Sequence, residues 1–332
     1  MLVSVVMAVH NGQEYLQEAL DSILLQTYTD LELIVVNDAS TDGTKEILAQ
    51  FTDGRVKVIH LAENKGAAFA LNLGIEQAQG NWIAIHDADD LSYPRRIEKQ
   101  VSYLHKHPGL VAVGSFIECI RDRDSQIPSQ NLRGLERLIN RMQTSAEIKS
   151  ELYRTCPLTH GTMIFSKKAF INLGKYNPNL RVSYDYDLWT RLITLGRIEK
   201  FPEKLYKYRM HSNSLTTKYP EQNIKEMFFS CAKYIRHTCY QNKKERPAMV
   251  VFGPKTLAEN YTLQARNSLN VLKVMDQRDL SYLPGIINFF KRKKLDGAVI
   301  LSNFRSRDRV FSYLTKNGME LNKNLFEFWI WF

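Results

Sequence analysis

Residues 82–90 read Trp82-Ile83-Ala84-Ile85-His86-Asp87-Ala88-Asp89-Asp90. Four mostly apolar residues are typical of a buried strand in a parallel sheet, and three carboxylates follow within four positions, where that strand must end. Carboxylates this close resist joint ionisation unless a cation compensates them, so a hard divalent metal ion is a natural partner. The alternative is a solvated acidic turn in which Asp89 or Asp90 caps the next helix, ahead of Pro94.

Length and composition indicate a globular chain. Its 332 residues, 44% of them hydrophobic, suffice for a full α/β core and an appended segment. The four cysteines form no CxxC pair and no metal-ligand spacing, so we expect reduced thiols in a cytoplasmic protein. A strand pattern begins at the N-terminus without a basic segment, and no apolar run approaches the roughly 18 residues of a membrane span. We therefore expect neither a signal peptide nor a transmembrane helix.

The net charge of +10 is unevenly distributed. Residues 221–332 hold 19 of the 45 Lys and Arg but only 10 of the 35 Asp and Glu. The first 220 residues are therefore nearly neutral. This asymmetry predicts an added basic segment with a partner of its own, either an anionic membrane surface or an anionic acceptor.

Residues 1–90 alternate between strand and helix patterns. Strands are predicted at 2–9, 31–37, 56–61 and 82–85, with helices at 13–25, after residue 44, and at 67–77. This rhythm predicts a parallel sheet with right-handed crossovers, in which ligands bind outside the carboxyl ends of the strands. The loops at His10, Asp38, Lys65 and Asp87 should therefore meet at one crevice.

The chemistry of these loops suits a nucleotide. Asp38 can accept a hydrogen bond from a base N–H or a ribose hydroxyl, Lys65 at a helix start suits a phosphate, and the aspartates can hold a metal that bridges a diphosphate. Each has a plain alternative. Residues 38–44 can form only an Asx turn with a helix cap, and Lys65 can be a solvated surface charge.

Four motifs occur in a fixed order: SVVMAVHNG at 4–12, VVNDASTDGT at 35–44, NKG at 64–66 and DADD at 87–90. In this order and spacing they resemble the inverting family 2 glycosyltransferases of the GT-A fold, closely over the first 120 residues and more loosely to about Thr217. The resemblance implies an α/β architecture, a Rossmann-like, mostly parallel sheet flanked by helices. It places a nucleotide-sugar half at about 1–120 and an acceptor half at about 121–220, within a domain of residues 1–220. Residues 221–332 would then be a basic, mainly helical C-terminal extension.

The resemblance also implies roles for individual residues. In the family the first loop and the aspartate after the second strand bind the nucleotide base, which carries over to Val9, His10 and Asp38. The Asp-x-Asp binds the metal and the donor diphosphate, which carries over to Asp87 and Asp89, with Ala88 between them. Mn²⁺ or Mg²⁺ is the implied cofactor.

Three positions depart from the family pattern. The usual Pro and Tyr of the first motif are Ala8 and His10, the Gly of the second is Ala39, and the Arg often found before Asn72 is Leu71. Because an imidazole replaces the tyrosine ring, we expect base stacking to be retained while the choice of donor stays open.

Residues 184–192, YDYDLWTRL, suit a helix whose first turn carries Asp185 and Asp187. Favourable placement of acids at a helix N-terminus, worth about 0.3–1 kcal/mol each, is the plain alternative. The segment is similar to the family's acceptor-side Glu/Gln-Asp motif, whose Asp matches Asp185, although Tyr184 stands where Glu or Gln is usual. The resemblance implies Asp185 as the general base, and we expect Asp187 to be structural.

Residues 206–214, YKYRMHSNS, look like the family's Tyr-Arg-x-His segment, whose Arg and His can reach the donor phosphates or the metal. This carries over to Arg209 as a contact of the donor and to His211 as a third metal ligand beside Asp87 and Asp89. The alternative for His211 is a satisfied surface or core histidine.

The resemblance therefore implies a metal-dependent inverting transferase of the hexosyl or N-acetylhexosaminyl type. Its donor would be a nucleotide-sugar, with UDP-sugars first in line, and its acceptor a hydroxyl of a glycan or lipid-linked saccharide in cell-surface polysaccharide or glycoconjugate synthesis. Two alternatives stay open: transfer to polyprenyl phosphate, and a degenerate nucleotide-binding regulator, which Tyr184 and Leu71 permit. We expect no nucleic-acid partner, and the sequence allows a homo-oligomer.

The C-terminal segment offers two interpretations. Residues 221–239 and 256–274 have helical composition, residues 286–294 set apolar bulk beside four bases, and residues 325–332 read LFEFWIWF. The aromatic side chains either pack on the catalytic domain or a second subunit, or residues 286–332 make peripheral contact with the inner face of the cell membrane. Each base near an anionic leaflet would add ~1 kcal/mol to such contact.

Overall fold

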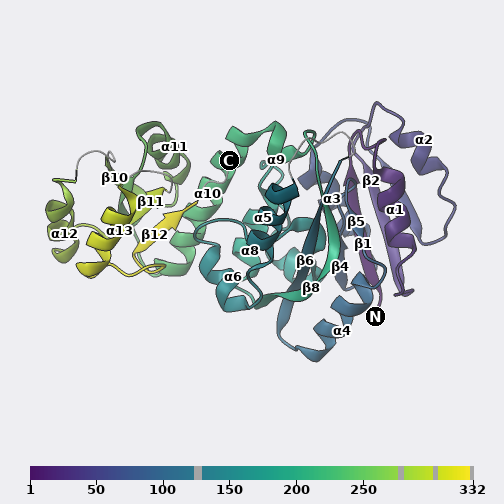
Figure 1. Ribbon diagram of the computed structural model, residues 1–332, viewed down its shortest axis with the longest axis horizontal. Coiled ribbons are helices and arrows are strands. Elements are labelled where there is room, and N and C mark those ends of the chain that lie inside the picture. The colour runs from purple at the N-terminus through teal and green to yellow at the C-terminus, as the bar shows by residue number, and fades with distance from the viewer. Residues whose placement is uncertain (123–128, 276–279, 302–305, 330–332) are drawn as a thin grey trace. The chain divides into compact units, whose positions relative to one another are not determined.

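The computed structural model describes residues 1–122, 129–275, 280–301 and 306–329. The chain forms two compact units, shown in Figure 1. The first comprises residues 1–148 and 157–219, and the second comprises residues 149–156 and 220–332.

The first unit is built on an eight-stranded sheet with the order β3-β2-β1-β4-β7-β6-β8-β5. Neighbours from β3 to β4 are parallel, β7 runs antiparallel to both β4 and β6, and β5 runs antiparallel to β8. This mostly parallel sheet confirms the predicted fold class. The strands are β1 (Val3–Val9), β2 (Leu31–Asn37), β3 (Val56–His60), β4 (Trp82–Ile85), β5 (Leu91–Ser92), β6 (Leu110–Arg121), β7 (Ile164–Ser166) and β8 (Arg197–Met210).

Helices connect these strands as the sequence rhythm predicts. They are α1 (Leu16–Leu24), α2 (Thr44–Ala49), α3 (Ala67–Gln77), α4 (Arg96–Lys106), α5 (Ser129–Asn140), α6 (Ser145–Glu151), α7 (Lys167–Asn172), α8 (Tyr184–Leu192) and α9 (Leu215–Lys218), with a 3₁₀ turn, η1, at His160–Thr162.

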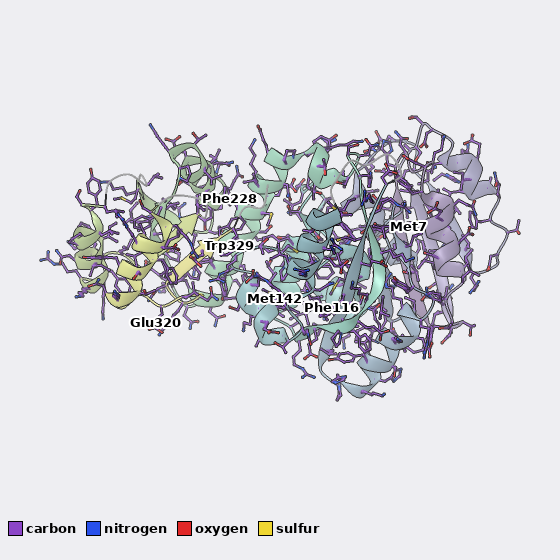
Figure 2. All side chains as sticks on the ribbon, in the orientation of Figure 1. Met7, Phe116, Met142, Phe228, Glu320 and Trp329 are labelled. Atoms are coloured by element: carbon purple, nitrogen blue, oxygen red, sulfur yellow. The ribbon has the colours of Figure 1, made fainter. Side chains whose placement is uncertain are left out.

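Alternate side chains of β1 face opposite layers, which explains why the strand is apolar throughout. Val5 and Met7 belong to a core cluster with Leu20 of α1, and Figure 2 labels Met7 within the first unit. On the other face, Gly74 lets α3 approach closely, since a Cβ there would lie only 2.6 Å from Cγ1 of Val6. Both faces of the sheet are therefore covered by helices.

The acidic loop lies between β4 and β5 and does not cap a helix. Helix α4 begins at Arg96, with Arg95 at the N-cap position and no side-chain cap. The alternative in which Asp89 or Asp90 caps the following helix is therefore wrong. Residues 91–92 form a short strand instead, because they pair with β8.

The second unit holds a parallel four-stranded sheet with the order β10-β9-β11-β12. Its strands are β9 (Ala248–Phe252), β10 (Asn270–Met275), β11 (Gly297–Leu301) and β12 (Leu325–Phe328), and its helices are α10 (Pro220–Cys239), α11 (Lys255–Ala265), α12 (Leu283–Lys291) and α13 (Arg307–Lys316). The prediction of a mainly helical extension missed this sheet. In particular, the helix predicted over 256–274 ends at Ala265. Strands of four to six residues are too short for periodicity to separate them from helix turns.

The aromatic residues of β12 are buried in the second unit. Phe326 and Phe328 are at most 1% exposed, and Phe328 packs against Phe228 of α10, which Figure 2 labels. Of the two interpretations, packing therefore holds for Phe326 and Phe328, which are not available for membrane insertion. Residues 330–332 lie outside the described ranges. No helix within the described ranges has the length and apolar character that crossing a membrane requires.

Candidate functional site

Three of the predicted loops meet at Asp38, directly after β2. Its carboxylate accepts the backbone N–H groups of Lys65 at 2.7 Å and Gly66 at 2.8 Å, and the residue is only 3% exposed. The Asp38 N–H donates to the carbonyl of Val9, and His10 places Nδ1 2.8 Å from the carbonyl oxygen of Asp38. Asp38 therefore holds the loops after β1 and β3 against the loop after β2, to which it belongs.

The other residues of these loops divide between surface and core. The His10 side chain is exposed, whereas the Val9 side chain belongs to the core cluster. Lys65 forms an ion pair with Glu63 and is 44% exposed, as the surface-charge alternative predicts. An Asx turn does occur in this region, but Asp42 forms it by accepting the Thr44 N–H at 3.1 Å.

The loop after β1 also lies beside the acidic loop. A Cβ built on Gly12 would lie 3.9 Å from Cβ of Ala88, and the half-buried Ala88 packs on the same core cluster as Val9. The predicted nucleotide-binding residues and the Asp-x-Asp motif are thus adjacent at the carboxyl edge of the sheet.

Each aspartate of the acidic loop has a different partner from a distant segment. His160 of η1 places Nδ1 3.3 Å from Oδ1 of Asp87, and His211 places Nε2 2.8 Å from Oδ2 of Asp89. Asp90 accepts the backbone N–H of Arg209 at 2.6 Å. Burial, followed by the charges of Asp89 and Asp87, raises the pKa of Asp90 well above its ordinary value.

Arg209 is committed to protein groups. Its Nε donates to the Asp89 carbonyl at 2.8 Å, a terminal nitrogen lies 2.9 Å from Oε2 of Glu18, and the guanidinium lies 4.5 Å from the centre of the Tyr15 ring. Its side chain is 8% exposed. Arg209 therefore ties α1 to the acidic loop, and contact with donor phosphates stays a prediction.

The structure brings two of the three predicted metal ligands together, Asp89 and His211. No group of three or more His, Cys, Asp or Glu side chains suited to a metal occurs within the described ranges. Nδ1 of His211 is buried and has no hydrogen-bond partner among the described residues. The ring proton can therefore lie on Nδ1, which leaves the lone pair of Nε2 for a cation. A carboxylate and an imidazole fit an ion whose other ligands are substrate phosphate oxygens and water.

Two buried polar side chains, those of His86 and Arg96, hold the backbone at the end of β4 and the start of the acidic loop. His86 is fully buried, and burial, followed by the charge of Arg96, lowers its pKa to about 3, so Nδ1 of the neutral ring donates to the Asp87 carbonyl. Arg96 is also fully buried and donates to the Ile85 carbonyl at 2.9 Å. We predicted no role for either residue. Their contacts come from the tertiary fold and not from a local motif.

Asp185 lies in the first turn of α8 and is half-buried. Its Oδ1 accepts the Tyr186 N–H at 2.8 Å. Burial raises its pKa, and the charge of His160 partly offsets that rise. Burial, followed by the charges of Asp87, Asp185 and Asp89, raises the pKa of Tyr184 well above its ordinary value. The Tyr184 ring lies 5.5 Å, centre to centre, from the ring of His160, which contacts Asp87.

Asp187, by contrast, has a structural contact, as expected. Its carboxylate is 2% exposed and accepts Nε of Arg191 at 3.0 Å and a terminal nitrogen at 2.7 Å. Arg191 also donates to the Leu173 and Lys175 carbonyls, which fixes the turn after α7 against α8.

Comparison with known proteins identifies the family. Residues 4–174 match the family model described as Glycosyl transferase family 2. The chain belongs to glycosyl transferase family 2. This family 2 glycosyltransferase is 34% identical over 226 residues to an uncharacterized glycosyltransferase of Haemophilus influenzae, covering 67% of this chain and 70% of that protein. It is 30% identical over 220 residues to the putative teichuronic acid biosynthesis glycosyltransferase TuaG of Bacillus subtilis, covering 65% and 82%.

Solved structures show the same fold as this family 2 glycosyltransferase. S. aureus TarS 1–349 in complex with UDP-GlcNAc aligns with a TM-score of 0.58 at 17% identity, covering 87% of this chain and 79% of that one. The mannosyltransferase PcManGT of Pyrobaculum calidifontis, in complex with GDP-Man and Mn²⁺, aligns with a TM-score of 0.50 at 21% identity, covering 79% and 68%. At these identities the likeness establishes the architecture alone.

Proposed function

We propose that this glycosyltransferase moves a hexosyl or N-acetylhexosaminyl group from a UDP-sugar to a hydroxyl of a glycan or lipid-linked saccharide in polysaccharide synthesis, with inversion and with metal assistance. The observation that carries the proposal is the 2.8 Å contact between Asp89 and His211, which joins the acidic loop to the end of β8. The UDP-GlcNAc bound to TarS and the teichuronic acid pathway in the name of TuaG support this choice of donor and process.

In this proposal the nucleotide lies over the loops that meet at Asp38. The exposed His10 ring stacks on the base, and the free lone pairs of the Asp38 carboxylate accept from the base or ribose. The backbone of Val9 and Ala88 lines the same edge, while Lys65 and Arg209 face the diphosphate. To reach a phosphate, Lys65 gives up its ion pair with Glu63. This costs little free energy, because both side chains are exposed.

Asp89 and His211 would hold Mn²⁺ or Mg²⁺, with Asp87 completing the protein side of the donor site. A divalent ion there supplies charge stabilisation for the departing diphosphate. The Mn²⁺ bound with GDP-Man by PcManGT supports divalent metal use in this fold.

Asp185 would act as the general base in a single displacement. The acceptor oxygen forms a bond to the anomeric carbon while the bond from that carbon to the diphosphate oxygen breaks, and UDP leaves with the electron pair. The acceptor proton passes to the Asp185 carboxylate. The contacts of His160 support this placement, because its ring lies 5.5 Å, centre to centre, from that of Tyr184, which precedes Asp185, and its Nδ1 lies 3.3 Å from Asp87.

The test is a thermal-shift and product-release screen with UDP- and GDP-sugars, with and without Mn²⁺. We expect stabilisation by at least one UDP-sugar that requires Mn²⁺ and is lost in Asp89→Asn. Asp30→Asn, at an aspartate that is 54% exposed and pairs with the N-terminus, is the matched control and should bind as the wild type does. Stabilisation by GDP-sugars alone would refute the UDP assignment, and sugar transfer at full rate by Asp89→Asn would refute the metal assignment.

We also propose that residues near the end of α12 contact the cytoplasmic face of the membrane, where the enzyme meets a lipid-linked acceptor. Phe289 is 52% exposed and is followed by the bases at 291–294, whereas Ile286 and Ile287 are buried. Phe289→Ser should reduce co-sedimentation with anionic vesicles. Leu263→Ser, at a leucine that is 54% exposed on α11, is the control and should not. Equal sedimentation of both variants would exclude this surface.

A further inference from the structure

His160 connects Asp87 to the interior of the first unit. Its Nδ1 lies 3.3 Å from Oδ1 of Asp87, and its Nε2 lies 2.9 Å from the hydroxyl of Tyr176. The residue is 9% exposed, whereas the Asp87 side chain is 31% exposed. The imidazole thus holds the carboxylate from the protein side and leaves its outer face open.

The hydrogen bond from His160 to Asp87 keeps its direction whether the imidazole is neutral or charged. Burial raises the pKa of Tyr176 well above its ordinary value, so its hydroxyl keeps its proton and donates to Nε2 of a neutral ring. The ring proton then lies on Nδ1 and faces Asp87. In the charged ring both nitrogens carry protons, so Nδ1 again donates to Asp87.

His160 itself has little freedom to move. Tyr176, its partner, is fixed by two hydrogen bonds between its backbone and the Asn72 side chain of α3, each 3.0 Å long. The rings of Tyr184 and Trp189 also flank the imidazole, with centres 5.5 Å and 6.2 Å away. A ring held this firmly can fix the rotamer of the carboxylate it contacts.

The next residue, Gly161, lies beside the second carboxylate oxygen of Asp87. A Cβ built on Gly161 would lie 2.7 Å from Oδ2 of Asp87 and would collide with the Tyr206 hydroxyl. The turn η1 therefore acts on both carboxylate oxygens: His160 makes a hydrogen bond with one, and the missing side chain of Gly161 leaves room for the other.

We propose that His160 is a positioning residue for the sugar donor. Its Nδ1–H holds the Asp87 carboxylate in the one orientation in which it meets the donor, so binding does not have to order that side chain. This inference rests on the proposed function, since it assigns Asp87 to the donor site. It extends that function to a residue of the acceptor half that touches neither substrate.

The test compares His160→Leu with His160→Asn. An Asn side chain can place its amide N–H where Nδ1–H was, whereas Leu removes the donor. A hydrogen bond to a charged group contributes about 1.5–3 kcal/mol, which converts to a roughly 10- to 150-fold loss. We expect His160→Leu to raise the donor KM by that factor with the acceptor KM unchanged, and His160→Asn to restore the donor KM to within about threefold.

Two further variants define the comparison. Tyr176→Phe leaves the imidazole without the hydroxyl that orients it and should raise the donor KM less than His160→Leu does. His105→Leu, at an exposed histidine of α4, is the matched control and should behave as the wild type. If His160→Leu fails to fold, His160→Asn and Tyr176→Phe still decide the question.

The outcomes separate the two proposals. A wild-type enzyme that transfers no sugar from any nucleotide-sugar contradicts the proposed function. If the wild-type enzyme is active, two results would contradict the role of His160. One is a wild-type donor KM in His160→Leu, and the other is a donor KM in His160→Asn that rises as much as in His160→Leu. A parallel rise in the acceptor KM would also contradict it, because a general structural defect predicts that result.

Discussion

Replacing Asp185 by Asn separates its proposed catalytic role from its place in the helix. The carboxylate makes a 2.8 Å hydrogen bond with the Tyr186 N–H, and the amide oxygen of Asn can accept the same bond. The side chain keeps its size and its position in the first turn of α8. What it loses is the ability to take a proton at neutral pH.

The expected effects on rate and on stability differ strongly. Removing a positioned general base lowers kcat by about 10²- to 10⁴-fold. For stability two effects oppose each other. Burial raises the Asp185 pKa, so ionising the residue costs folding free energy at neutral pH, and Asn removes that cost. Asn also loses the favourable acid at the helix N-terminus, about 0.3–1 kcal/mol. The free energy of unfolding should therefore change by no more than about 1 kcal/mol.

The assay follows release of UDP at saturating donor and acceptor, with urea unfolding and calorimetric UDP binding measured alongside. Asp187→Asn is the comparison, because it weakens the buried contact with Arg191 and should lower the free energy of unfolding more than Asp185→Asn does. A kcat for Asp185→Asn within tenfold of the wild type would refute the base assignment. That result would favour a phosphate acceptor, which needs little help in losing a proton.

Three further predictions concern the same unit. Asp89→Asn should weaken UDP binding in Mn²⁺ by up to about 10³-fold, since one charge pair at ~4 Å and an effective dielectric of 20 contributes ~4 kcal/mol, and calorimetry with and without Mn²⁺ measures this. Because burial raises the pKa of Asp185 above 3.8, kcat should fall with decreasing pH at a higher pH than that value, and an acid limb at or below it in the pH profile would contradict the assignment. Arg191→Ala removes the ion pair with the buried Asp187 and should lower the free energy of unfolding by about 3–5 kcal/mol, as urea unfolding can measure. Arg197→Ala is the control, since this side chain is 49% exposed and lies 3.5 Å from Glu199, and it should lower the free energy of unfolding by at most ~1 kcal/mol. Equal losses in Arg191→Ala and Arg197→Ala would show that burial of the ion pair does not matter here.

The first half of the sheet was accessible from sequence because its signals are local. Both β1 and β2 are mostly apolar runs that end at a polar loop, and α3 occupies the predicted residues 67–77. The second half depends on pairing between distant segments. β6 and β8 pair in parallel although they lie about 90 residues apart, with register shifts along the pair, and no local pattern specifies such a partner.

The site divides in the same way. The resemblance to the family predicted that Asp89 and His211 serve one site, although 122 residues separate them. His160 carried no such signal, because a single histidine between a turn and a short strand is typical of an ordinary core position. Arg96 likewise stood among surface-like charges in the sequence, and only its complete burial shows that it supports the acidic loop. Residues that act through contacts made by the fold cannot be found from residue type and spacing.

The charge of the acidic loop follows a different logic from the one that its sequence suggests. Three carboxylates within four residues indicate a compensating cation, yet each has a partner of its own: His160 for Asp87, His211 for Asp89 and the Arg209 N–H for Asp90. A divalent ion at Asp89 and His211 must therefore replace an existing 2.8 Å contact, and does not simply neutralise an unpaired charge. The exchange becomes favourable when donor phosphates add their oxygens to the same ion, since two protein ligands complete less than half of an octahedral shell. The metal ion and the nucleotide should accordingly each raise the affinity for the other, so that the Asp89–His211 contact opens for a metal ion mainly when the donor is present.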